Sequence, residues 1–417
     1  MTEPKLRFPE FTGPWEQRKF SELVTIERGG SPRPIDNYIT EDENGLNWVK
    51  IGDAPAMGNY ITSTAQKIKP EGLKKTREVH PGDLILSNSM SFGKPYIMAI
   101  DGCIHDGWLL IRDERKSFDL KFLCTLLGTD SMLNQYKAVA AGSTVNNLNK
   151  ELVGGATVSY PSMDEQVAIG EFLSKFDEAI TLHQRKLDDT KKLKKALLQK
   201  MFPKDSELEP EIRFPDFTGP WEQRKLDDLC SLVTKQTGFD YSSTIKPALV
   251  NEHLEETLPF IQNKDFAGNN INMDTDFYIP EEIVKKYPKI TLDQPCLLIS
   301  ISGKIGNVGL YKRSERAFIG GAVGICRLMD DTNGEFIMQE LLSDKGQHYF
   351  QSLIKASSHQ NITVEDIRKI EILMPSVPEQ EKISAFFEDL DNLITLHQRK
   401  LDDLKKLKKS LLQQMFV

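Results

Sequence analysis

Two blocks of this chain each occur twice, and the repeat limits the possible folds more than any other feature. The segment RFPEFTGPWEQRK at 7–19 returns at 213–225 with one change, Glu10 to Asp216. The segment ITLHQRKLDDTKKLKKALLQKMF at 180–202 returns at 394–416 with only three changes. The residues between the repeated blocks differ, and the second half has eight more of them. The repeat therefore predicts two unlike bodies carried on duplicated scaffolding.

The length agrees with this organisation. At about 100–200 residues per domain, 417 residues predict two or three domains, each able to bury its own core. We expect a repeated lead at 1–19, a first body at 20–160 (body one), a long helix at 161–203, a linker with the second lead at 204–225, a second body at 226–374 (body two) and a second long helix at 375–417.

Both long segments have the pattern of coiled-coil helices. Ser162-x-x-Glu165 and Ser376-x-x-Glu379 match the capping box at a helix start. Apolar residues then alternate by four and three for more than four heptads, which predicts a long rod with an apolar seam. The predicted interface consists of Ile169, Leu173, Phe176, Ile180, His183, Leu187, Leu197, Ile383, Phe387, Leu390, Ile394, His397, Leu401, Leu404 and Leu411.

The charge pattern predicts how the two rods pair. Each helix is acidic in its first half and basic in its second half. Antiparallel pairing sets opposite charges against each other and also suits each helix dipole. His183 and His397 interrupt the seam at equivalent points and are interpreted as polar residues that fix the register. An antiparallel pair within one chain would give the protein a pseudo-two-fold axis, with the two bodies at opposite ends of the rods.

The bodies have the mixed pattern of α/β (α+β) domains. Strands are predicted at 47–51, 83–87 and 107–111 in body one, with a helix over 119–140. Body two repeats this order, with strands at 258–261, 296–300 and 323–328 and a helix over 334–356.

A search for catalytic and cofactor motifs finds none. Gly303–Gly309 is glycine-rich but fits neither the dinucleotide nor the P-loop pattern, and Asp177-Glu178-Ala179 lies within an amphipathic helix. The five cysteines are scattered, which argues against a disulfide framework or a zinc ribbon and suits a reducing cytoplasm. The chain lacks an apolar run of membrane-spanning length and a signal-peptide pattern. We therefore expect a cytoplasmic, non-enzymatic protein with no catalytic residues, no metal site and no membrane partner.

Polar, turn-rich clusters at matched places in the two bodies are the candidate functional residues. Small hydroxyl, amide and basic side chains contact phosphates and base edges in DNA complexes, although such clusters also mark ordinary loops. Their recurrence in two dissimilar bodies favours the functional interpretation. The candidate DNA-binding residues are Arg33, Lys50, Ser87, Asn88, Ser89, Ser91, Lys94, Ser143, Thr144, Asn146 and Asn147 in body one, and Lys235, Gln236, Asn263, Lys264, Ser300, Ser302, Lys304, Ser357, Ser358, His359, Gln360 and Asn361 in body two.

The order of these pieces resembles the specificity subunit of Type I restriction-modification systems. The resemblance rests on the leads at 7–16 and 213–222, and on Pro161-Ser162…Glu165-Gln166 and Pro375-Ser376…Glu379-Gln380, each opening a long helix. The strand-to-loop segments 83–87 and 296–304 add to it. It covers essentially the whole chain, and the same order of pieces occurs twice.

The resemblance implies that each body is a target recognition domain that reads one half of a bipartite double-stranded DNA sequence, and that the coiled coil sets the spacing. It implies two modification (methyltransferase) subunits as partners, and optionally two restriction (translocase/nuclease) subunits. S-adenosylmethionine, ATP and Mg²⁺ are then expected on the partners and not in this chain. The net charge of −8 is compatible, since partners can supply part of the DNA clamp.

Two alternatives stay open at this point. The chain could serve a Type IIB/IIG-like system, in which one partner fuses methylation and cleavage. It could also be a non-DNA coiled-coil scaffold that presents two protein-binding modules, which would show no phosphate-driven salt dependence.

Overall fold

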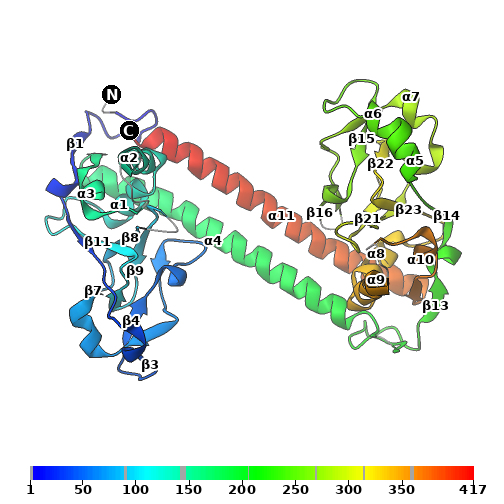
Figure 1. Ribbon diagram of the computed structural model, residues 1–417, viewed down its shortest axis with the longest axis horizontal. Coiled ribbons are helices and arrows are strands. Elements are labelled where there is room, and N and C mark those ends of the chain that lie inside the picture. Colours follow the sequence, from blue (N-terminus) through cyan, green and yellow to red (C-terminus); the bar gives the residue numbers. More distant parts are fainter. Residues whose placement is uncertain are drawn as a thin grey trace. The chain divides into compact units, whose positions relative to one another are not determined.

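The protein is described by a computed structural model covering residues 3–88, 92–140, 147–204, 206–267, 270–312, 315–356 and 361–417 (Figure 1). The chain divides into two compact units. The first unit comprises Met1–Lys186 and His397–Val417, and the second comprises Leu187–Leu396. Each unit therefore contains one body together with a part of each long helix.

The two long helices are α4 (Met163–Lys200) and α11 (Val377–Met415), and they run antiparallel in both units. In the first unit, Nδ1 of His183 lies 3.1 Å from Nδ1 of His397, and Asp177, earlier in α4, pairs with Lys408, later in α11. In the second unit, Lys194 pairs with Asp391. The predicted antiparallel pairing is confirmed.

All residues of the predicted seam are buried or half-buried. Burial lowers the pKa of His183, and the facing His397 lowers it further. The neutral form of His183 is therefore favoured at this point of the seam.

The ends of the helices pack against the bodies. Ile169 and Leu173 at the start of α4 join the core of body one, together with Met415 and Phe416 at the end of α11. Ile383, Phe387 and Leu390 near the start of α11 form a matching cluster with Met201 and Phe202 at the end of α4.

Aromatic contacts repeat this docking in the two units. Phe416 lies 6.1 Å from Trp15 and 5.5 Å from Phe122, measured between ring centroids. Phe202 lies 5.9 Å from Trp221 and 5.6 Å from Phe336. In each unit, the body thus holds the beginning of one long helix and the end of the other.

The repeated lead is a strand that binds the end of its own body. Strand β1 (Glu16–Lys19) pairs with β12 (Thr157–Tyr160), and β13 (Glu222–Lys225) pairs with β24 (Glu371–Met374), both antiparallel.

The glutamates of the predicted capping boxes have a different partner. Arg7 donates to both carboxylate oxygens of Glu165 at 2.8 and 2.7 Å, and Arg213 does the same to Glu379 at 2.7 and 2.8 Å. Each glutamate is only 1% exposed, so its charge is satisfied by the arginine of the lead and not by the helix cap. The capping-box interpretation of these glutamates was therefore wrong.

Body one contains two five-stranded sheets. One has the order β3-β6-β4-β10-β7 and the other β2-β11-β8-β9-β5. Their strands are β2 (Thr25–Arg28), β3 (Ile39–Thr40), β4 (Leu46–Val49), β5 (Tyr60–Ile61), β6 (Gln66–Ile68), β7 (Arg77–Val79), β8 (Leu84–Ser87), β9 (Pro95–Met98), β10 (Gly102–Ile104) and β11 (Trp108–Arg112). Helices α1 (Leu120–Leu127), α2 (Asp130–Ala140) and α3 (Lys150–Gly155) follow the strands in the chain.

Body two repeats this plan with shorter sheets, of order β14-β23-β20-β21 and β18-β15-β22-β19, and a small β16-β17 hairpin. The strands are β14 (Cys230–Lys235), β15 (Thr257–Ile261), β16 (Phe266–Ala267), β17 (Asn270–Ile271), β18 (Tyr278–Pro280), β19 (Thr291–Leu292), β20 (Cys296–Ser300), β21 (Val308–Tyr311), β22 (Ala317–Ile319) and β23 (Val323–Leu328). The helices are α5 (Gly238–Asp240), α6 (Lys246–Ala248), α7 (Glu281–Val284), α8 (Gly334–Leu342), α9 (Asp344–Ala356) and α10 (Val364–Arg368).

Each predicted strand is present, but each predicted single helix is two helices. The break lies at Thr129 in body one and at Ser343 in body two. The hydroxyl of Thr129 accepts from the N–H of Met132, and that of Ser343 accepts from the N–H of Gly346. Both hydroxyls thus serve as N-caps that begin a second helix.

One buried acid makes body two sensitive to pH. Glu340 in α8 is 2% exposed, and burial raises its pKa to about 7 from an ordinary 4.5. Because the folded-state pKa is raised, its contribution to stability is present below about pH 4.5 and is lost as the pH rises through about 7. We expect Glu340→Gln to stabilise the second unit by about 3 kcal/mol at pH 8 and by almost nothing at pH 4.5.

Urea unfolding of both proteins across this pH range tests the prediction, with Glu255→Gln on an exposed loop as the control. A stability difference that does not change with pH would contradict it. Body one has Leu126 in the matched place, 214 positions earlier, which shows that this packing position does not need a carboxyl group.

Candidate nucleic-acid interface

In each body, sequence-predicted residues lie together at the ends of corresponding strands. In body one, β2 and β8 end at the edge where β11 begins, since Arg28 pairs with Leu109 and Ser87 pairs with Trp108. In body two, β14 and β20 end where β23 begins. The segments that follow these strands, 29–33 and 88 in body one and 236–238 and 301–302 in body two, are called the strand-end sites.

Asp106 organises the strand-end site of body one. Its carboxylate accepts from the hydroxyl of Ser31 at 3.0 Å and lies 3.7 Å from the guanidinium of Arg33. Its backbone oxygen accepts from the side chains of Arg28 at 3.2 Å and Asn88 at 2.8 Å. The Arg33 side chain is 83% exposed, so it is held loosely and remains available to an anionic ligand.

A second basic segment lies against this site and was missed by the sequence reasoning. A Cβ atom on Gly30 would lie 2.3 Å from the backbone oxygen of Lys75, so glycine is required for this close approach. Lys74, Lys75 and Arg77 in this segment are exposed. The run Lys-Lys-Thr-Arg was visible in the sequence, but nothing there placed it beside residues 29–33.

In body two, the strand-end site lines a cavity of about 540 Å³. The sequence-predicted Lys235, Gln236, Ser302 and Asn361 all line it. Ser302 and Asn361 are joined by a β-bridge, while the Gln236 amide donates to the backbone oxygen of Ile319 at 3.3 Å. The structure thus joins three segments that are distant in the sequence.

Some candidates mainly hold the loops. Ser87 and Ser300 are fully buried, and their hydroxyls accept from the N–H groups of Lys94 and Asn307 at 3.1 and 2.8 Å. Asn88 is 2% exposed. DNA contact by these three buried side chains would require the turns to open, whereas their present bonds shape the strand-end sites.

The other described candidates lie at the neighbouring sheet or loop. Lys50 donates to Gln66 at 2.8 Å, and Lys94 lies over the ring of Tyr96. Asn263 donates to the backbone oxygens of Ser302 and Lys304 at 2.6 and 3.2 Å, which ties the second sheet of body two to its strand-end site.

Lys264 forms an ion pair with Asp276. In body one, Asn147 directly precedes Leu148, whose N–H donates to the backbone oxygen of Asn88. Ser89, Ser91, Ser143, Thr144, Asn146, Ser357, Ser358, His359 and Gln360 lie outside the described residues. The DNA contacts proposed for all of these candidates stay predictions.

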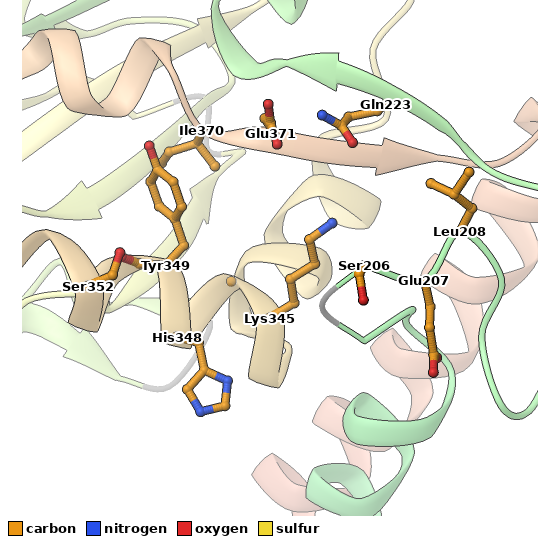
Figure 2. A pocket seen from close by; sticks show the side chains of 11 residues that line it. Ser206, Glu207, Leu208, Gln223, Lys345, His348, Tyr349, Ser352, Ile370 and Glu371 are labelled. Atoms are coloured by element: carbon orange, nitrogen blue, oxygen red, sulfur yellow. The ribbon is translucent and has the colours of Figure 1, made fainter.

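Another hollow of the second unit, of about 760 Å³, is lined by helix α9, the start of β24 and linker residues 206–208. Figure 2 shows Lys345 and Tyr349 of α9 directed towards β24, with His348 turned away from that strand. It contains none of the predicted DNA-binding residues. In body one, Gln135 occupies the position matching Tyr349 and exchanges two hydrogen bonds with the backbone of Thr157.

The described ranges hold no candidate metal cluster and no candidate membrane span. Histidine, cysteine, aspartate and glutamate residues do not come together there in threes in a way that could hold a metal ion. None of the described helices is long and apolar enough to cross a membrane.

The repeated body, the lead strand and the antiparallel helices define the class of protein. The sequence family model of the Type I restriction modification DNA specificity domain matches residues 12–192 and again 218–406. The chain belongs to this family.

The similarity to relatives and solved structures extends over nearly the whole chain. The chain is 21% identical to the Type I restriction enzyme MjaVIII specificity subunit of Methanocaldococcus jannaschii, covering 98% of this chain and 92% of the relative. It is 22% identical to the putative type I restriction enzyme MjaX specificity subunit of the same organism, covering 98% and 94%.

The crystal structure of a Type-I restriction-modification S subunit from M. genitalium shares the fold, with a TM-score of 0.66 at 15% identity, covering 100% of this chain and 99% of that one. A chain from a study of complex assembly in the type I R-M system has a TM-score of 0.53 at 18% identity, covering 96% and 97%. The predicted function as a Type I DNA-specificity subunit is confirmed over the Type IIB/IIG-like and scaffold alternatives.

Proposed function

We propose that each body reads one half of a bipartite DNA target through its strand-end site. The observation that carries the proposal is that two unlike bodies place polar and basic residues at the same strand ends. Arg33, Lys74 and Lys75 in body one suit DNA phosphates, while Lys235, Ser302 and Asn361 supply donors and acceptors in body two. Unlike residues on the same frame account for two different half-sites.

Exposed leucines on the long helices support docking of the modification subunits. Leu182 of α4 and Leu407 of α11 are both 50% exposed in the first unit, and Leu193 and Leu396 are 51% and 44% exposed in the second. Leu182 and Leu193 are 11 positions apart, about three helical turns, so they lie on one face of α4. We propose that two methyltransferase subunits cover these faces, and that two restriction subunits join where the system has them.

The chemistry is assigned to those partners. S-adenosylmethionine, ATP and Mg²⁺ would be bound by the modification and restriction subunits, and this chain would supply sequence recognition without catalysis. The protein would act in the cytoplasm, where cellular DNA is available. Purified alone, the chain is then expected to transfer no methyl group to DNA.

Replacing one exposed arginine tests the strand-end site. We expect Arg33→Ala to weaken DNA binding about three- to tenfold near 0.1 M salt and to lower the salt slope by about one, because one phosphate contact is lost. The loss should be nearly the same for target and unrelated DNA. Gel-shift titrations of the full-length chain with its modification subunit, at several salt concentrations, measure both quantities.

Arg115→Ala is the matched control, since Arg115 is also exposed but follows the opposite end of β11. Equal effects of the two substitutions would reject the strand-end site as the DNA interface. A complex that binds DNA with no salt dependence would reject DNA recognition itself.

A further inference from the structure

Body two carries an unusually exposed aromatic ring beside its strand-end site. Phe239 is 81% exposed, the largest value among the exposed large apolar side chains of the described residues. It follows Gly238, which lines the 540 Å³ cavity together with Lys235 and Ser302. A phenylalanine that is this exposed loses the free energy of burial, which amounts to about 2 kcal/mol for such a side chain, unless a ligand covers it.

The ring is carried by a helical segment and not by an irregular loop. Thr237 caps the segment by accepting from the N–H of Asp240 at 3.1 Å, and the helical path continues to Ala248. Tyr241 and Ile245, four residues apart, pack into the core of body two, with Ile245 fully buried. Phe239 stands two residues before Tyr241, about half a turn around the helical path, so it points away from that core.

The surroundings of the ring suit nucleic acid better than an apolar partner. Ser242, Ser243 and Lys246 on the same segment are exposed, and Lys235 and Asn361 lie at the cavity. Hydroxyl, amide and ammonium groups are the usual partners of phosphates and base edges. A single apolar ring within such a rim has the composition of the wedges that proteins insert between base pairs.

Among its described residues, body one shows no exposed phenylalanine of this kind. After β2 its chain continues through Gly29-Gly30-Ser31-Pro32-Arg33, where the exposed group is a guanidinium. Among the described residues of body one, the exposed large apolar side chain is Tyr60, which lines another hollow together with Met57 and Leu182. The difference between the two strand-end sites is therefore one of chemistry as well as sequence.

We propose that Phe239 is a DNA wedge: it inserts between two base pairs of the half-site read by body two, partly unstacks them and bends the duplex there. This inference rests on the proposed function. It predicts that the half-site of body two is selected in part by how easily one base step opens, whereas the half-site of body one is selected without such opening.

The test uses the full-length chain with its modification subunit and a duplex that carries 2-aminopurine at successive positions of both half-sites. Wild-type protein should raise 2-aminopurine fluorescence at one step of a single half-site. Phe239→Ala should abolish that rise and weaken binding of target DNA about tenfold, because base–aromatic stacking is lost. Phe239→Trp should retain both.

Met329→Ala is the control, since Met329 is 43% exposed but follows the opposite end of β23. Specific binding with no fluorescence rise, or a rise that persists in Phe239→Ala, overturns the wedge and leaves the proposed function intact. Loss of the modification subunit from Phe239→Ala, with an unchanged rise in the protein that remains assembled, would assign the ring to a protein contact and likewise overturn the wedge. Absence of specific DNA binding by the wild-type complex would instead refute the proposed function.

Discussion

Replacing Asp391 by alanine should destabilise the second unit by about 3 kcal/mol, because it leaves a buried lysine without its counter-charge. Lys194 is 8% exposed, and its ammonium donates to both Asp391 oxygens at 2.7 and 2.8 Å. Burial lowers the pKa of Lys194, and Asp391 raises it again only in part. Burying these two charges costs desolvation free energy, and the attraction between them offsets that cost. The pair also fixes how α4 and α11 lie against each other.

The double variant Lys194→Met with Asp391→Leu should recover most of the loss, since both charges are removed together. Hydrogen exchange with mass spectrometry at increasing urea concentration measures the unfolding of each unit on its own. A double variant as unstable as Asp391→Ala would show that shape and not charge governs this position.

The chain provides a matched control for this experiment. Asp177 and Lys408 form the corresponding pair in the first unit, each 214 positions from its counterpart. Asp177→Ala should therefore lower protection in the first unit and spare the second. Equal loss in both units from either substitution would mean that the two units do not unfold separately.

The sequence was informative where periodicity and charge act locally. The switch from acidic to basic residues predicted the antiparallel pairing, because only that direction sets opposite charges against each other. Heptads predicted both rods, because a helical period depends on residues close in the chain. Apolar runs predicted the central strands β4, β8 and β11 for the same reason.

Other contacts between residues far apart in the chain were not predictable in this way. The ion pair between Arg7 and Glu165 joins residues 158 apart, and a local capping pattern competed with it in the sequence. Asp106 stood in an unremarkable turn, yet the fold surrounds it with Arg28, Ser31 and Arg33. The helix breaks at Thr129 and Ser343 could not be predicted, because a single capping hydroxyl leaves the helical spacing of the apolar residues almost unchanged.

Lengthening both helices should lengthen the gap between the half-sites. Both α4 and α11 pass from one unit into the other, so an added heptad in each preserves the seam. Tandem copies of residues 187–193 and 390–396 add seven residues to facing stretches. At about 1.5 Å per residue this adds about 10 Å, or about three base pairs of DNA at most. Because each added pair also turns the duplex by about a tenth of a turn, we expect an increase of about one to three pairs.

A heptad added to α4 alone is the control. It moves the apolar residues of α4 out of register with those of α11, so it should reduce assembly with the modification subunit without setting a new gap between the half-sites. Circular dichroism and hydrogen exchange of the doubly extended chain establish that its helices are intact. Its assembly with the modification subunit is measured on the same preparation.

The decisive measurement is the methylation pattern of whole genomes from cells that carry either the natural chain or the doubly extended one. Two unchanged half-sites separated by a gap that is one to three base pairs longer is the predicted result. An unchanged or shorter gap, or altered bases within either half-site, would contradict an arrangement in which two unlike readers are set apart by the length of a paired helix.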